Sequence, residues 1–126
     1  MSFLGQVRKK ALQANRRIVL PESSDERVIR AASQILKEGL AQVVLIGNQE
    51  TIMHSAKAYE VSLAGAKIVD PYNFERLNDY VNKLVELRAK KGMTPEEAKK
   101  ILLNDPTFFG AMLVKMGDAD GMVSGS

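Results

Sequence analysis

Residues 17–29, which read RIVLPESSDERVI, are the stretch that decides the fold. The apolar run at residues 18–20 is typical of a strand, and Pro21 ends it because proline has no N–H to donate to a sheet. We expect Ser23 or Ser24 to cap a following helix, in which apolar residues recur with helical spacing. The stretch therefore predicts a strand, a tight polar turn and a helix.

The turn at residues 21–25 is a candidate wall of a binding site. In open α/β sheets, ligands bind beyond the carboxyl ends of parallel strands, where such turns lie. The alternative is an ordinary strand-to-helix loop, and this stretch taken alone favours the ordinary loop.

Two later segments are expected to be strands: residues 66–71, which end at a proline, and residues 42–47, whose apolar run is continuous. Continuous rather than alternating apolarity is typical of strands that are buried on both faces of a parallel sheet. Helices are expected at residues 3–14, 24–38, 48–59, 74–91, 94–103 and 105–116. The helix at residues 105–116 is apolar nearly all round and is expected to be central and buried. The pattern predicts an α/β fold, with a mostly parallel sheet and flanking helices in three layers.

Composition narrows the class of protein. A chain of 126 residues with 45% apolar and 26% charged residues fits one soluble domain. The absence of cysteine excludes disulfides, thiolate metal sites and a cysteine nucleophile. No apolar run approaches the roughly 20 residues of a membrane span, so a cytoplasmic location is expected. A net charge of +3 with 6% aromatic residues argues against a nucleic-acid platform and favours a small anionic ligand.

Arg88 is the first candidate site residue. It continues an apolar helical stripe that contains Leu77, Val81 and Leu84, where an unpaired charge is costly. Its guanidinium could pair with a carboxylate, bind an anionic ligand or reach water, and the stripe alone does not separate these alternatives. His54, the chain's one histidine, has no evident partner and is not expected to carry chemistry.

The end of the chain is the second candidate. After a short strand near residue 122, Ser124, Gly125 and Ser126 offer backbone N–H groups and hydroxyls that suit an anion. A flexible Gly/Ser linker is the alternative. Asp118 and Asp120 lie nearby, but Asp120 is expected to shape the start of the strand, and neither is assigned a catalytic role. Dinucleotide-binding, P-loop, zinc-protease and nucleophile-elbow motifs do not occur, and no metal site is predicted.

Taken in order, these segments resemble the N-terminal part of the phosphate acetyltransferases, within the phosphate acetyl/butyryl transferase family. The resemblance rests on residues 18–22, 25–28, 43–48, 67–71, 85–88, 90–92, 109–114 and 117–125. It implies a two-domain α/β enzyme with a cleft between the domains, usually a homodimer. Residues 1–126 would then be the N-terminal part of the first domain, without the second domain or the C-terminal return.

The resemblance also implies a reaction, in which acetyl-CoA and phosphate give acetyl phosphate and CoA. An aspartate takes the proton from the CoA thiol, the thiolate attacks the acetyl carbonyl, and arginine and serine groups hold the phosphate. CoA is a substrate here, and no cofactor is implied. Arg88 matches an active-site arginine of the family, and Ser124, Gly125 and Ser126 begin its phosphate and CoA loop. The catalytic aspartate and a Ser-Arg pair lie beyond Ser126, so this chain is expected to be inactive alone.

Three alternatives remain. Phosphate butyryltransferases share the fold and the reaction type. The C-terminal region of some malic enzymes is a similar but non-catalytic module that senses acetyl-CoA. A small parallel α/β domain with a structural role is the third, and it predicts that Arg88 is ion-paired within the domain.

Overall fold

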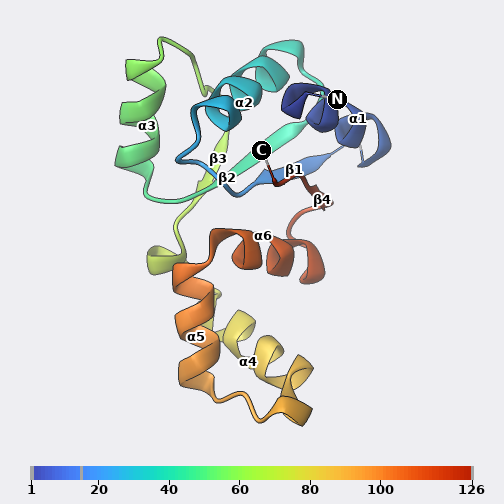
Figure 1. Ribbon diagram of the computed structural model, residues 1–126, viewed down its shortest axis with the longest axis vertical. Coiled ribbons are helices and arrows are strands. Elements are labelled where there is room, and N and C mark those ends of the chain that lie inside the picture. The colour runs from blue at the N-terminus through green and yellow to red at the C-terminus, as the bar shows by residue number, and fades with distance from the viewer. Residues whose placement is uncertain (1, 15, 126) are drawn as a thin grey trace.

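A four-stranded parallel sheet lies at the centre of the computed structural model, which describes residues 2–14 and 16–125 (Figure 1). Its strands are β1 (Arg17–Leu20), β2 (Gln42–Ile46), β3 (Lys67–Val69) and β4 (Gly121–Met122). They lie in the order β3-β2-β1-β4, and every pairing is parallel. The predicted α/β class with a parallel sheet is therefore confirmed.

Helices cover both faces of the sheet (Figure 1). The first face carries α1 (Phe3–Ala14), α2 (Glu26–Glu38) and α3 (Gln49–Ala58). On the second face α6 (Pro106–Lys115) lies next to the sheet, and α5 (Pro95–Asn104) and α4 (Leu77–Leu87) pack beyond it (Figure 1). The 3₁₀ turns η1 (Pro71–Asn73) and η2 (Ala89–Lys91) lie before and after α4. This arrangement confirms the predicted three layers. No helix in the described part of the chain is both long and apolar enough to cross a membrane.

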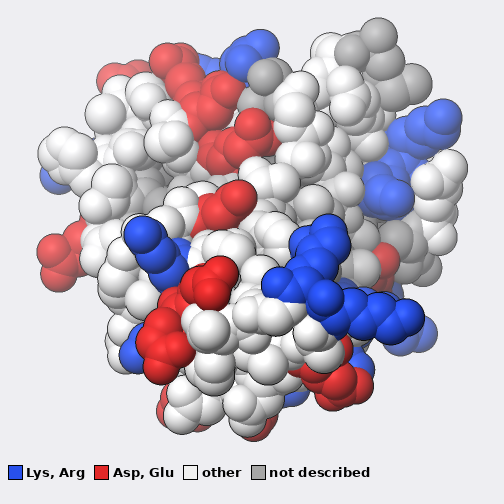
Figure 2. Space-filling model, turned by 60° about the horizontal axis from the view of Figure 1, so that its bottom comes forward, with Lys and Arg blue, Asp and Glu red and all other residues white. Residues whose placement is uncertain are grey.

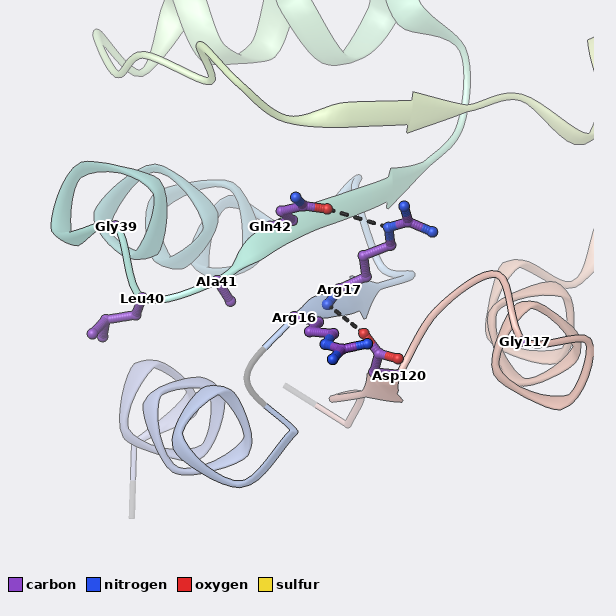
Figure 3. Close-up of a pocket in the computed structure, with 8 residues that line it drawn as sticks. All are labelled: Arg16, Arg17, Gly39, Leu40, Ala41, Gln42, Gly117 and Asp120. Carbon is purple, nitrogen blue, oxygen red and sulfur yellow. Dashed lines mark hydrogen bonds between the residues drawn. The ribbon is translucent and has the colours of Figure 1, made fainter.

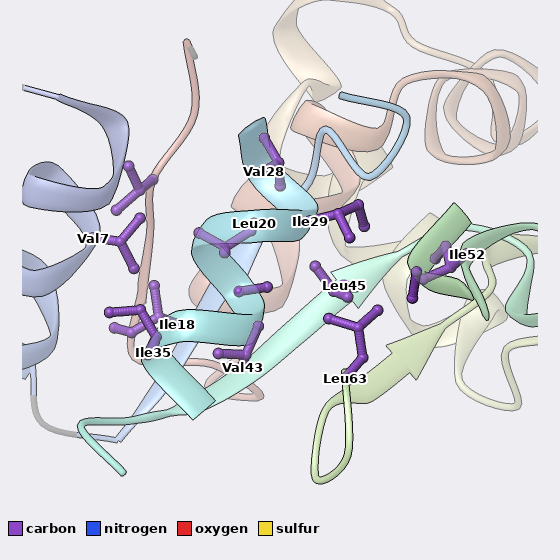
Figure 4. Packing of buried hydrophobic residues seen from close by; sticks show 13 residues of the cluster. Val7, Ile18, Leu20, Val28, Ile29, Ile35, Val43, Leu45, Ile52 and Leu63 are labelled. Carbon is purple, nitrogen blue, oxygen red and sulfur yellow. The ribbon is translucent and has the colours of Figure 1, made fainter. Parts of the chain in front are cut away.

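The central strands are buried on both sides because successive side chains point to opposite faces. Ile18 and Leu20 of β1 pack under the first face, whereas Val19 packs under the second. The same alternation runs along β2. Figure 4 shows how the first cluster fills the space between the sheet, α1 and α2.

Helix caps were mostly predictable, with one error at α2. Asn48, Thr94 and Asp105 cap their helices as their positions predict, and Gly39 adopts the left-handed conformation (φ 65°) that ends α2. The prediction that Ser23 or Ser24 caps α2 was wrong, because the cap is Asp25. Ser23 instead donates its hydroxyl to the Ile46 carbonyl (2.5 Å) and so holds the end of β2 against this turn.

Two helices of the second face differ from expectation. The predicted helix at residues 74–91 is shorter, because α4 covers residues 77–87 and η2 follows it. Helix α6 was expected to be central and buried, but Ala111 and Lys115 are exposed, and its buried residues are Phe109, Gly110, Met112 and Leu113. Gly110 allows this helix to approach closely, because a Cβ there would lie 3.1 Å from a methyl group of Val19.

Candidate functional site

The strand order creates a switch point beside β1. The chain passes from β1 outward to β2 and β3, and it then returns to form β4 on the opposite side of β1. In open α/β sheets, ligands bind outside the carboxyl ends of the strands at such a point. The loops that flank it are residues 21–25 after β1 and residues 123–125 after β4, so these loops form the first part of the candidate site.

A hydrogen bond joins the two loops. The Gly125 N–H donates to Glu22 Oε1 (2.8 Å), and Gly125 has a φ of 82°, in the left-handed region that favours glycine. The structure therefore brings Ser124 and Gly125 to the switch point. It also shows that the Gly125 N–H already has an acceptor. Ser126 lies outside the residues that the structure describes.

A cavity of about 580 Å³ opens next to the switch point. The turn at residues 21–25 lines it, although the sequence taken alone favoured an ordinary loop there, and the loop after β2 and the start of α6 complete the lining. The lining residues are Pro21, Glu22, Ser23, Ser24, Asp25, Ile46, Gly47, Asn48, Thr51, Ile52, Ser55, Pro106 and Thr107. Helices α2, α3 and α6 all begin here, and helix N-termini carry partial positive charge.

The cavity has no cation of its own among its lining residues. Its charged side chains are Glu22 and Asp25, and Asp25 forms an ion pair with Arg27 (3.0 Å). The remaining polar lining groups are hydroxyls and an amide. An anionic ligand at this edge would therefore need a cation from outside the cavity.

Arg88 is not among the residues that line this cavity, but its guanidinium lies against the first turn of α6. Its guanidinium carbon lies 5.8 Å from the ring centroid of Phe108, in the first turn of α6, next to the lining residues Pro106 and Thr107. Within residues 2–14 and 16–125, no carboxylate lies within ion-pair distance of the guanidinium. Pairing of Arg88 within the domain is thus not what the structure shows. The anion-binding and water-facing alternatives remain.

The end of the molecule that α4 and α5 form carries both signs of charge. Figure 2 shows Lys and Arg beside Asp and Glu on this face, so the basic groups do not form one continuous field. A long polyanion requires a continuous basic face. The face therefore suits contact with a small charged group better than contact with a duplex.

Asp118 has structural partners. It accepts hydrogen bonds from the Arg76 guanidinium (2.7 Å to each carboxylate oxygen) and from the buried Tyr80 hydroxyl. Burial and the hydrogen bond to Asp118 raise the pKa of Tyr80 above its ordinary value. The carboxylate thus fastens the start of α4 to the turn that precedes β4.

Asp120 belongs to the opposite, amino edge of the sheet. Its carboxylate accepts the Arg17 N–H (2.9 Å), which confirms the expectation that it shapes the start of the last strand. Figure 3 shows this contact in a second cavity of about 500 Å³, where Arg17 also donates to the Gln42 side chain (3.2 Å). The polar groups of this edge therefore align β1, β2 and β4.

The described residues contain no group of three or more potential metal ligands. His54 is exposed on α3. Neither feature adds to the candidate site.

Reasoning from the sequence overlooked Glu22, to which it gave no role. Its one local signal is its place directly after Pro21, at the end of a buried strand. The contact with Gly125 exists only because β4 lies beside β1, and local sequence patterns carry no sign of that pairing.

Comparisons with known proteins agree with this architecture. The sequence model described as "Phosphate acetyl/butaryl transferase" matches residues 2–126. The phosphate acetyltransferase of Acetivibrio thermocellus is 51% identical over the whole chain, and that of Thermoanaerobacterium thermosaccharolyticum is 41% identical. A crystal structure of a phosphotransacetylase from Streptococcus pyogenes superimposes on 99% of the chain with a TM-score of 0.82 and 39% identity. The chain spans only 37% to 38% of the length of these three relatives.

Proposed function

The chain belongs to the phosphate acetyl/butaryl transferase family, and from this premise we propose that it supplies one side of an acetyl-transfer site. The reaction is the transfer of an acetyl group between CoA and inorganic phosphate. Residues 1–126 make up the N-terminal part of the first of two α/β domains. The observation that carries the proposal is the Arg88 guanidinium, which has no carboxylate partner among the described residues and lies against the first turn of α6.

Arg88 acts as an anion ligand in this proposal. A guanidinium presents several N–H donors in a plane and binds phosphate oxygens in pairs, which a lysine does not. The contact with the Phe108 ring, 5.8 Å from the guanidinium carbon to the ring centroid, limits where the planar group can lie. Fixed donors of this kind stabilise the charge that develops on the phosphate and on the acetyl oxygen during transfer.

The loop that contains Ser124, Gly125 and Ser126 is the second contribution of this chain. Its hydroxyls donate to the phosphate from the carboxyl side of β4. The base that takes the thiol proton and the remaining phosphate ligands come from outside these 126 residues, so we expect the chain to be inactive alone. CoA, acetyl phosphate and phosphate are its ligands, with no metal, nucleic acid or membrane partner, in a cytoplasmic homodimer.

A chimera tests the proposal. The matching segment of the Acetivibrio thermocellus phosphate acetyltransferase is replaced by this chain, and thioester formation from acetyl phosphate and CoA is measured. We expect the chimera to be active and the 126-residue chain to be inactive. In the chimera, Arg88→Ala should lower kcat/KM by about 100-fold or more, because a donor to the transition state is lost.

The matched control is Arg16→Ala, which removes an arginine from the cavity at the opposite edge of the sheet. Its kcat/KM should stay at the level of the unmodified chimera. Full activity of the Arg88→Ala chimera would remove Arg88 from the site, and turnover by the 126-residue chain alone would show that the base lies within it.

The family description also covers butyryl transfer, so the acyl preference is part of the test. We expect acetyl phosphate to be used with higher kcat/KM than butyryl phosphate. A reversed preference favours a butyryltransferase. A chimera that binds CoA without turnover favours the non-catalytic sensor.

A further inference from the structure

Glu22 lies at the switch point, directly after β1 and its proline. It follows the buried Pro21 at the end of β1, and the Asp25 N–H donates to its backbone carbonyl (3.0 Å). Its backbone is therefore fixed by a tight turn. The carboxylate reaches from this turn across the switch point to the loop after β4.

The loop after β4 has few other anchors. Strand β4 contains only two residues, and the Val123 N–H donates to the Val19 carbonyl (3.0 Å). Two residues farther on, the Gly125 N–H donates to Glu22. Gly125 has a positive φ, and a Cβ there would meet no described atom within 4 Å, so the Glu22 carboxylate is the contact that fixes its N–H.

The contact changes what this loop offers to an anion. A backbone N–H that donates to a carboxylate at 2.8 Å is not free to donate to phosphate. The nearby negative charge would also repel an anionic ligand at close range. Gly125 is therefore placed as a tether point. The neighbouring Ser124 lines a separate cavity of about 470 Å³, together with Lys9 and Lys10 of α1.

Resting on the proposed function, we propose that Glu22 is a positioning residue of the acetyl-transfer site: its carboxylate tethers the Gly125 N–H and thereby holds Ser124 in place to bind phosphate. The charge of Glu22 is not required for this role, but the acceptor oxygen and the side-chain length are. Glu22 touches neither substrate nor reacting atoms.

The test uses three substitutions in the active chimera. Glu22→Gln keeps an acceptor oxygen at the same reach and should leave the KM for acetyl phosphate within about 3-fold of the unmodified chimera. Glu22→Asp and Glu22→Ala cannot reach Gly125 and should raise that KM by about 10-fold or more. The melting temperature should change by less than about 3 °C in all three, since the contact is at the surface.

Glu26→Ala is the matched control. It removes another carboxylate four positions away that pairs with the exposed Arg30 rather than with the loop. Its KM should equal that of the unmodified chimera. If Glu26→Ala raised the KM as much as Glu22→Ala does, the loss of any negative charge at this edge would explain both results. That outcome would overturn the proposal.

A second measurement does not depend on activity. In the chimera, hydrogen exchange should show a protected Gly125 amide in the unmodified protein and in Glu22→Gln, and loss of protection in Glu22→Ala. An unprotected amide in the unmodified chimera would overturn the tether, whatever the kinetics show.

The kinetic outcomes separate the proposal from its alternatives. A lower KM for acetyl phosphate in Glu22→Ala would show that Glu22 competes with the anion, and this would overturn the proposal. An equal rise of KM in Glu22→Gln and Glu22→Ala would show that the charge of Glu22 is required, and this would overturn it as well. If the Glu22 pattern holds while Arg88→Ala retains full activity, the tether stands and the role of Arg88 falls. If Arg88→Ala is impaired while Glu22→Ala is not, the reverse holds.

Discussion

The two faces of the sheet are packed by different means. Every fully buried side chain of the first-face cluster, under α1, α2 and α3, is aliphatic. The second-face cluster contains Tyr80 and Phe109, whose ring centroids lie 5.6 Å apart, with Phe74 packed edge-on against both. The first face is thus packed by aliphatic side chains alone. The second depends on specific contacts: the ring contacts, the hydrogen bond between Tyr80 and Asp118, and the close approach of α6 to the sheet at Gly110.

The difference bears on function, because the second face carries Arg88. Helix α4 is fastened at its start by Arg76 and Tyr80 to Asp118, and at its end Arg88 lies over Phe108. Specific contacts of this kind fix the direction of a helix more closely than aliphatic packing does. The following changes test how far the two faces differ.

Asp118→Ala should have the largest effect on stability. It leaves the buried Tyr80 hydroxyl without an acceptor, which costs about 1–3 kcal/mol of unfolding free energy. Urea denaturation measures the loss. Glu38→Ala on the first face, which breaks the exposed pair with Arg8, should lower the midpoint much less than Asp118→Ala does. Equal losses of unfolding free energy in Asp118→Ala and Glu38→Ala would contradict the proposed difference between the faces.

Gly110→Ala should come next. The added methyl would lie 3.1 Å from Val19 and 3.2 Å from Ile46, so overpacking costs about 1–3 kcal/mol, and the better helix propensity of alanine offsets up to about 1 kcal/mol. Thermal unfolding reports the net loss. As a control, Gly121→Ala meets only the flexible Lys10 side chain and should cost less. The reverse order would mean that α6 does not require its close approach to the sheet.

Glu60→Gly should stabilise the chain. Glu60 has a φ of 57° directly after the C-terminal end of α3, a conformation that strains any residue with a Cβ. Glycine relieves this strain, and the expected gain is about 0.5–1 kcal/mol in urea denaturation. In contrast, Ala58→Gly in the last turn of α3 should destabilise by a similar amount. Destabilisation by Glu60→Gly would show that the side chain has a favourable contact that exceeds the strain.

The smallest effects are expected in the pH dependence of the two faces, and the first face responds at the acid end. The hydrogen bond from Arg8 lowers the pKa of Glu38 from 4.5 to about 2, so this contact stabilises the fold above pH 4.5 and is lost as pH falls toward 2. Melting temperatures of the wild type and Glu38→Gln should therefore converge near pH 2. A gap that persists at that pH would show that the carboxylate charge is not its cause.

The second face should respond at the other end of the pH scale. The pKa of Tyr80 is raised by burial and by its bond to Asp118, so its contribution is present below pH 10 and is lost as pH rises above that value. Melting curves between pH 9 and 11 should fall less steeply for Tyr80→Phe than for the wild type. Parallel slopes would assign the alkaline loss to other groups.

The sequence by itself determined the local structure. Strands at 17–20 and 42–46, the caps at Asn48, Thr94 and Asp105, and the stop at Gly39 all follow from residues within one turn or strand of one another. Propensity, periodicity and capping act over that range, which is why these features could be predicted. Arg88 was likewise visible as a charge on an apolar stripe.

Only the tertiary structure decided which distant residues meet. Asp25 caps α2, whereas Ser23 binds the Ile46 carbonyl at the end of β2, a contact between distant parts of the chain. The tie between Asp118 and Tyr80 depended on how α4 docks, and the tether between Glu22 and Gly125 depended on β4 pairing with β1. The order of the strands brings these partners together. That order depends on how the whole core packs, so local sequence patterns do not predict it.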